Sequence, residues 1–153
     1  MKNLELMLAK HPFLHGLSDE YIREIAGHAM IFKFDEGDIL FDEGEPANKF
    51  YLIIKGKVAI TTFAPNKGIT IQTVEDGEML GWSWLVAPYK YKFNARVLTR
   101  TEFIAINGVE LRNQCEKDPG LGYELLRRMV QAIAFRLEQT RLLVLDIYGN
   151  RSK

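Results

Sequence analysis

The spacing of apolar residues divides the chain into two helical ends and a strand-rich middle. From Leu4 to Ala29 apolar residues recur at helical spacing, with one interruption at His11–Pro12. Ser18 precedes the second helical stretch as a candidate N-cap, and acidic residues follow it in the first turn. Both features stabilise the start of a helix, because they interact favourably with its unpaired backbone N–H groups. The sequence therefore predicts N-terminal helices within residues 1–30.

The middle of the chain, residues 31–106, predicts short strands separated by glycine turns. The β-branched and aromatic runs are Ile31–Phe34, Ile39–Phe41, Phe50–Ile54, Val58–Phe63 and Ile69–Val74. Turn residues separate these runs at intervals of about ten positions, which is typical of a small β-sandwich or barrel. The segment Ala64–Gly68, which includes Pro65 and Asn66, predicts a hairpin loop between paired strands.

The C-terminal part, residues 109–148, is again helical in its pattern. Asp118 and Pro119 predict a helix start, with the aspartate as N-cap and the proline in the first helical position. The pattern continues to about Ile147, and Gly149 is expected to end the helix. A helix of about 28 residues is about 42 Å long. We expect it to extend beyond the small β-body.

Seven positions along this last helix follow an alternating spacing of four and three. They are Leu126, Val130, Ile133, Leu137, Thr140, Val144 and Ile147. A heptad pattern of this kind is expected of a helix that pairs with a partner helix. The alternative is a single wide apolar face that packs on its own domain. The length of the helix favours the first interpretation, a parallel homodimer with these residues at the interface.

Composition and charge narrow the class of protein. A chain of 153 residues with 47% hydrophobic residues is long and apolar enough for one domain, and we expect a single unit over residues 1–153. Twenty basic and twenty acidic residues give zero net charge, which argues against nucleic-acid binding through bulk electrostatics. The chain lacks a long apolar stretch and a signal-peptide pattern, so we expect a cytoplasmic protein without membrane association.

Signals for catalysis or metal binding are missing from the sequence. It contains no nucleophile elbow, no P-loop and no zinc-protease motif, so we expect no enzymatic activity. The acidic turns of residues 35–45 lack the spacing of a calcium loop, and the histidines lack ligand spacing. Cys115 is the single cysteine, which excludes an internal disulfide, and we expect it to be partly buried and unreactive.

Two segments in the strand-rich region resemble a known family. DEGDILFDEGEPA at residues 35–47 resembles the opening turn, strand and turn of a cyclic-nucleotide-binding domain. FYLIIKGKV at residues 50–58 resembles the next strand and glycine turn of that family, and the similarity extends from about Leu14 to Tyr148. The resemblance implies a mainly β member of the α+β class. Its fold would be an antiparallel double-stranded β-helix, or jelly roll, with N-terminal helices and a long C-terminal dimerisation helix, as in Crp/Fnr-like regulators.

The resemblance also locates the family's phosphate-binding cassette, at residues 77–97. In the family, a cassette glutamate accepts a hydrogen bond from the ribose 2′-hydroxyl, and an arginine holds the cyclic phosphate. Here Trp82 occupies the glutamate position and Phe93 the arginine position, while Gly81, Ala95 and Val97 match the family pattern. Loss of one partner of a desolvated charge pair costs about 2–5 kcal/mol. We therefore expect altered or lost binding of cAMP and cGMP and no other cofactor.

The candidate ligand site implied by the alignment comprises cassette residues and one residue of the last helix. The candidates are Leu80, Gly81, Trp82, Ser83, Trp84, Phe93, Asn94, Ala95, Arg96 and Thr140. The aromatic side chains either line an apolar pocket or fill the vacated site as core. Arg96 or Lys92 could replace the missing cation, although alternation along a strand favours a solvent-facing Arg96. Arg136 and Arg141 flank Thr140 and could contact an anionic ligand, although solvated helix faces are favoured for both.

Three functional hypotheses follow. The first is a stand-alone dimeric sensor that binds a small-molecule effector in the β-roll, moves its C-terminal helix and signals to a protein partner. The second is a ligand-free structural adaptor, and the third is a truncated Crp/Fnr-type transcription regulator. Crp/Fnr-like regulators continue into a helix-turn-helix domain, whereas only residues 149–153 follow the predicted helix here. Direct DNA binding is therefore not expected of this chain.

Overall fold

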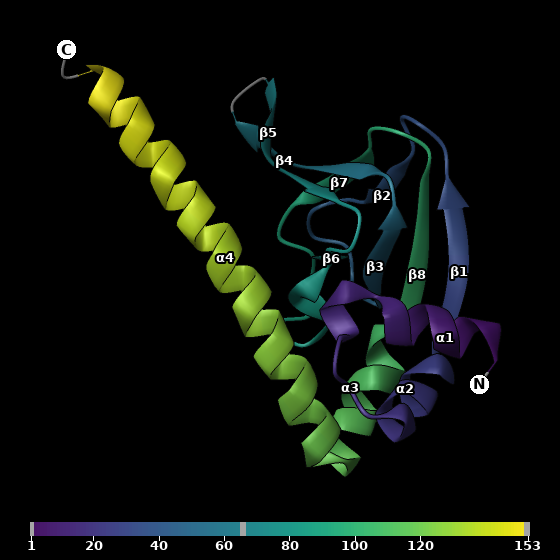
Figure 1. The fold of residues 1–153 in the computed structure, drawn as a ribbon. Helices are drawn as coiled ribbons and strands as arrows, with labels where there is room; N and C mark the ends of the chain where they lie inside the picture. The colour runs from purple at the N-terminus through teal and green to yellow at the C-terminus, as the bar shows by residue number, and fades with distance from the viewer. Residues whose placement is uncertain (1, 65–66, 152–153) are drawn as a thin grey trace.

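The computed structural model describes residues 2–64 and 67–151, which form a jelly roll flanked by helices (Figure 1). The strands are β1 (Ala29–Phe34), β2 (Ile39–Phe41), β3 (Lys49–Lys55), β4 (Lys57–Ala64), β5 (Lys67–Glu75), β6 (Met79–Leu80), β7 (Asn94–Val97) and β8 (Thr101–Asn107). The helices are α1 (Asn3–Lys10), α2 (Asp19–Ala26), α3 (Gly108–Lys117) and α4 (Pro119–Arg151), with two 3₁₀ helices, η1 (Pro12–Leu14) and η2 (Trp82–Trp84). The predicted fold class is confirmed.

The described strands form two four-stranded antiparallel sheets, in the orders β1-β8-β3-β6 and β2-β7-β4-β5. All five predicted strand regions are present, and β4 pairs with β5 so that Ala64 faces Lys67. The predicted loop residues Pro65 and Asn66 lie outside the described residues. The short strands β6 and β7 lie at the two ends of the cassette, so the sheet pairing holds both of its ends in place.

The sheet that contains β3 is covered on both faces, which explains the unbroken apolar run in that strand. Phe50 and Leu52 point toward the helices, whereas Tyr51 and Ile53 pack inside the roll. Successive side chains of a strand point to opposite faces, so a strand buried on both sides needs apolar residues throughout.

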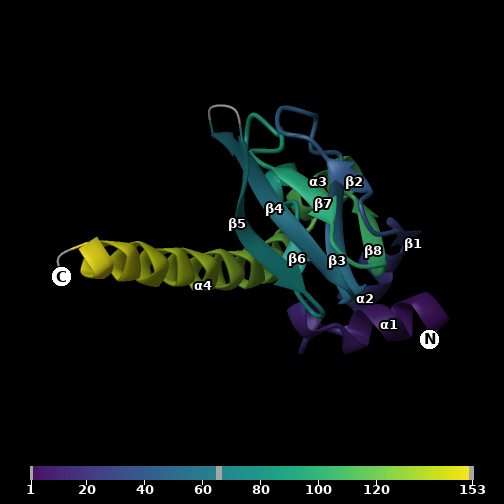
Figure 2. The same cartoon turned by 90° about the horizontal axis from the view of Figure 1, so that it is seen from above.

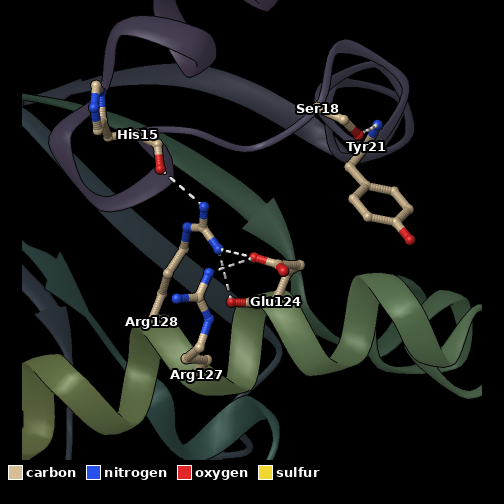
Figure 3. Close-up of polar contacts among 6 residues, drawn as sticks. All are labelled: His15, Ser18, Tyr21, Glu124, Arg127 and Arg128. Atoms are coloured by element: carbon tan, nitrogen blue, oxygen red, sulfur yellow. Dashed lines mark hydrogen bonds and ion pairs between the residues drawn. The ribbon is translucent and has the colours of Figure 1, made fainter.

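The N-terminal helices begin and break near the predicted positions. The chain turns at His11, and η1 follows with Pro12 in its first position. The Ser18 hydroxyl accepts a hydrogen bond from the Tyr21 N–H at 3.3 Å and caps α2 (Figure 3). The expectation that the helical pattern reaches Ala29 was wrong, because α2 ends at Ala26 and Ala29 already pairs with Ile106 in β8.

The last helix, α4, begins as predicted but continues further. The Leu121 N–H donates to the Asp118 carboxylate at 3.3 Å, which caps the helix at its proline. The 33 residues of α4 run through Gly149 to Arg151, so the expectation that Gly149 ends the helix was wrong. One glycine costs a helix only about 1 kcal/mol relative to alanine, which does not by itself stop it.

The base of α4 is attached to the N-terminal region. Arg128 donates to the carbonyl of His15 at 2.8 Å and also contacts the Glu124 carboxylate, which Arg127 reaches at 2.9 Å (Figure 3). Further along, the C-terminal half of α4 projects away from the β-roll (Figure 1, Figure 2). No helix in the described ranges combines the length and apolar character needed to cross a bilayer.

Candidate functional site

A pocket of about 210 Å³ lies between the cassette and the middle of α4. Its apolar and aromatic lining consists of Phe41, Ile60, Leu80, Trp82, Tyr91, Phe93, Ile133 and Leu137. Its remaining lining consists of Gly81, Gln72, Ser83, Lys92, Arg136 and Thr140. The lining thus combines a mainly apolar wall with two basic side chains and contains no carboxylate.

The turn at Gly81 directs the cassette into this pocket. Gly81 has φ +85° and precedes η2, in a left-handed conformation that side chains rarely adopt. A Cβ at this position would lie 3.3 Å from both the Lys49 carbonyl and the ring of Tyr91. Glycine therefore allows the turn and the close approach that place Trp82 and Ser83 at the pocket.

Tyr91 forms a fixed aromatic wall of the pocket. Its hydroxyl donates to the Lys49 carbonyl at 2.7 Å and accepts from the Lys49 N–H at 3.3 Å. Its ring stacks on Phe41 with centroids 3.7 Å apart. Burial raises the pKa of Tyr91 to about 12, so the phenol stays neutral at physiological pH.

Arg136 is the largely buried cation of the pocket. Its side chain is only 13% exposed, donates to the Met79 carbonyl, and lies 3.9 Å from a carboxylate oxygen of Glu78. Burial lowers the pKa of Arg136, and the Glu78 charge partly offsets this effect. The expectation of a solvated Arg136 was therefore wrong, whereas Arg141 is exposed and paired with Glu138.

Six of the ten candidate residues line the pocket. They are Leu80, Gly81, Trp82, Ser83, Phe93 and Thr140. The Thr140 hydroxyl donates to the Arg136 carbonyl at 2.9 Å, one helical turn earlier. The structure therefore brings the two halves of the cassette and α4 together around one space.

The other four candidates lie elsewhere. Trp84 is fully buried in the core, with its ring centroid 5.4 Å from that of Phe50. Asn94 is buried and accepts the Glu43 N–H at 2.8 Å, and Ala95 packs inside the roll. Arg96 is exposed and borders a separate surface depression, whereas Lys92 borders the pocket. Of the two cations considered as replacements, only Lys92 is at the site.

Sequence reasoning considered ligand contact by Arg136 only as an alternative to a solvated position, although one signal favoured the pocket. Arg136 lies four positions before Thr140, and residues at this spacing share a helix face. A helix that brings Thr140 to the ligand site therefore brings Arg136 there as well. Phe41 was missed as a pocket residue, because its strand is distant from the cassette in sequence.

The predicted interface residues of α4 form a largely exposed stripe. Leu126, Val130, Leu137, Val144 and Ile147 are exposed apolar side chains. Thr140 is exposed as well, whereas Ile133 is half-buried against the core and the pocket. Three members of this stripe, Ile133, Leu137 and Thr140, also line the pocket.

Cys115 lies outside the pocket. Cys115 belongs to α3, and its side chain is buried in the hydrophobic core. This burial raises the pKa of its thiol to about 11. A thiol that is protonated at neutral pH is a poor nucleophile. Among the described residues, no cluster of three histidine, cysteine or acidic side chains is placed to hold a metal ion.

Known proteins share this fold and sequence pattern. The CRP-like cAMP-activated global transcriptional regulator of Mycobacterium tuberculosis is 26% identical over 156 residues, which cover 98% of this chain and 68% of that protein. A Geobacter metallireducens protein assigned to cyclic nucleotide binding superposes with a TM-score of 0.79 at 28% identity, covering 90% of this chain and 99% of that one.

The regulatory subunit of a cAMP-independent protein kinase A from Trypanosoma brucei has the same fold, with a TM-score of 0.71 at 20% identity over 92% of this chain and 50% of that one. Residues 31–118 match the family model of the cyclic nucleotide-binding domain. This match covers more than half of the chain and includes the cassette, strands β2 to β8 and most of β1. The chain therefore belongs to the cyclic nucleotide-binding domain family.

Proposed function

We propose that this chain is a small-molecule sensor module in which the pocket binds an effector and α4 transmits the signal within a homodimer. The observation that carries the proposal is the sharing of residues between pocket and stripe. Ile133, Leu137 and Thr140 line the pocket and also belong to the heptad stripe of α4. A ligand and a partner helix would therefore contact the same segment.

The attachment of α4 supports this coupling. The base is held by Arg128 at the His15 carbonyl, whereas the C-terminal half projects from the roll (Figure 2). A ligand that contacts Leu137 from the pocket would favour one position of α4 over another. Such a difference in affinity between two helix positions is what a ligand needs to shift their populations.

The exposed stripe supports the homodimer. Large apolar side chains extend along α4 as far as Ile147, and monomeric proteins rarely expose a continuous apolar surface of this kind. Heptad spacing is the pattern by which two such helices interlock. Changes in α4 position would alter the surface that the dimer offers to a protein partner.

The residues of the cassette support an effector that differs from the cyclic nucleotides bound by the family. Phe93 and Trp82 stand where the family has its phosphate arginine and ribose glutamate, and the side chain of Arg96 borders a different depression. The side chains of Trp82 and Phe93 nevertheless leave an open space of about 210 Å³. An open pocket favours a sensor over the alternative of a ligand-free adaptor with a filled core.

Calorimetric titration with cAMP and cGMP tests the ligand part of the proposal. We expect dissociation constants at least about 30-fold weaker than those of a family member with an intact cassette, because the charge pair is missing. Binding at micromolar concentration or tighter would contradict altered recognition.

The dimer dissociation constant, measured with and without a saturating pocket ligand, tests the sensor part. A coupled system should change this constant by about 5-fold or more. An unchanged constant for every ligand that binds the pocket would favour the adaptor.

A further inference from the structure

We propose that the effector of this pocket is a small aromatic carboxylate, whose acidic group binds Arg136 and whose ring lies against Trp82 and Phe93. The proposal names the ligand class of the site and so depends on the proposed function above. It follows from the charge, the wall and the volume of the pocket.

The charges that line the pocket select an anion. Arg136 and Lys92 both line it, and the lining includes no aspartate or glutamate. A guanidinium has five N–H donors, and the contacts described for Arg136 are one hydrogen bond to the Met79 carbonyl and an ion pair with Glu78 at 3.9 Å. That distance exceeds a hydrogen bond, so donors remain for a ligand. Burial lowers the pKa of Arg136, and an anion would offset this penalty.

The largely buried cation of the pocket, Arg136, is supplied by α4, whereas the cassette contributes the exposed Lys92. Arg136 belongs to the helix, whereas Phe93 occupies the cassette position that carries the phosphate arginine in the family. An anion held by Arg136 would therefore lie on the helix side of the pocket. Planar guanidinium and carboxylate groups match in a bidentate arrangement, which favours a carboxylate as the bound group.

The aromatic side chains that line the pocket favour a ligand with an aromatic ring. Trp82 and Phe93 are half-buried and turn part of their surface to the pocket. Tyr91 and Phe41 form a stacked pair beside them. Aromatic rings attract one another beyond the effect of buried area, in offset or edge-to-face arrangements. A ligand ring would therefore be surrounded by aromatic and aliphatic side chains on several sides.

The volume restricts the ligand to one ring with a short acidic substituent. The pocket measures about 210 Å³, and an engineered protein cavity of about 150 Å³ holds one benzene molecule. Sites for larger ligands usually measure about 300–1,000 Å³. Benzoate or phenylacetate matches this space, whereas a purine with a ribose and a phosphate would extend beyond it.

Titration with benzoate, phenylacetate and the neutral analogue benzamide tests the proposal directly. Calorimetry and the intrinsic tryptophan fluorescence, to which Trp82 at the pocket contributes, both report binding to the intact protein. We expect a carboxylate dissociation constant below about 1 mM and at least about 10-fold tighter than that of benzamide. Arg136→Gln should weaken carboxylate binding about 30-fold and remove the preference over benzamide.

Arg141→Gln is the matched control, because Arg141 lies on the same helix, is exposed and pairs with Glu138 away from the pocket lining. This variant should bind carboxylates as the unmodified chain does. If Arg136→Gln does not fold, Arg136→Lys keeps the charge and should keep the preference for carboxylates. The comparison of benzoate with benzamide needs no variant.

Four results would overturn the assignment. Equal binding of benzamide and benzoate, or full carboxylate binding by Arg136→Gln, would exclude anion recognition while a sensor pocket remains. Tighter binding of cAMP than of either carboxylate would also exclude the proposed ligand class and leave the sensor. Absence of carboxylate binding would overturn the class alone, because the proposed function is decided separately by the effect of pocket ligands on the dimer constant.

Discussion

The guanidinium of Arg136 on α4 donates a hydrogen bond to the backbone carbonyl of Met79, in strand β6 near the start of the cassette. This contact joins the helix to the edge of the pocket, 57 residues away along the chain. A second polar contact, from Arg128 to the His15 carbonyl, holds the base of the same helix. An anion that binds Arg136 would act on the attachment nearer the projecting half of α4, which links occupancy of the pocket to the helix.

The apolar stripe of α4 predicts a dimer that depends on one face of the helix. Val144→Glu should weaken the dimer at least about 30-fold, because it places an unpaired charge in an apolar interface. Leu142→Glu is the control, since Leu142 is also exposed but lies outside the heptad stripe. Sedimentation velocity over a range of concentrations measures both variants. Equal effects of the two substitutions, or none, would contradict the predicted interface.

Substitution of the two tryptophans by alanine should reduce the free energy of unfolding by different amounts. Trp84 is fully buried, so Trp84→Ala should reduce the free energy of unfolding by about 3–5 kcal/mol. Trp82 is only half-buried at the pocket, so Trp82→Ala should cost about 1 kcal/mol. Urea denaturation measures both changes. Similar costs would indicate that Trp82 fills the core and does not line an open site.

The buried ring of His11 should make the protein less stable in mild acid. Its Nε2 lies 2.7 Å from the Ile53 carbonyl oxygen, and its Nδ1 accepts the Phe13 N–H at 3.2 Å, so the buried ring fits its neutral form. Burial lowers the pKa of His11 below its usual value of 6.5. Between the lowered pKa and 6.5 the unfolded chain binds more protons than the folded one.

The free energy of unfolding should therefore be highest above pH 6.5 and should decline as the pH falls below that value. Urea denaturation at a series of pH values measures this decline. His11→Gln should reduce it, whereas His15→Gln, at an exposed ring, should leave it in place. An identical decline in the His11→Gln protein would assign the effect to other groups.

Two glycines with positive φ should differ in the cost of substitution by alanine. At one position only backbone strain opposes the side chain, whereas at the other the side chain would also overlap a neighbour. Gly44 has φ +88°, and a Cβ there would meet nothing within 4 Å, so Gly44→Ala should cost about 1–2 kcal/mol. Gly56 has φ +136°, and its Cβ would lie 2.1 Å from the Thr101 hydroxyl oxygen. Gly56→Ala should therefore cost about 3 kcal/mol or more. Chemical denaturation compares the two variants, and equal costs would contradict the close approach of Gly56 to Thr101.

Signals that act over a few residues predicted much of the fold. The Ser18 and Asp118 caps, the break at His11 and the five strand regions all follow from local hydrogen bonds and side-chain periodicity. The same locality explains the errors at Gly149 and Ala29. The cost of one glycine in a helix is small, and the strand pairing of Ala29 with Ile106 involves a residue far away in sequence.

The sequence by itself determined the jelly roll and the long C-terminal helix, and its resemblance to the family predicted that Trp82 and Phe93 replace the cassette's charged pair. The tertiary structure decided which neighbouring residues face the pocket. Trp82 lines it while Trp84, two positions later, is buried in the core, and Arg136 is largely buried beside Met79 and Glu78. Burial of a side chain depends on which distant segments pack against it, and periodicity along one helix or strand does not contain that information.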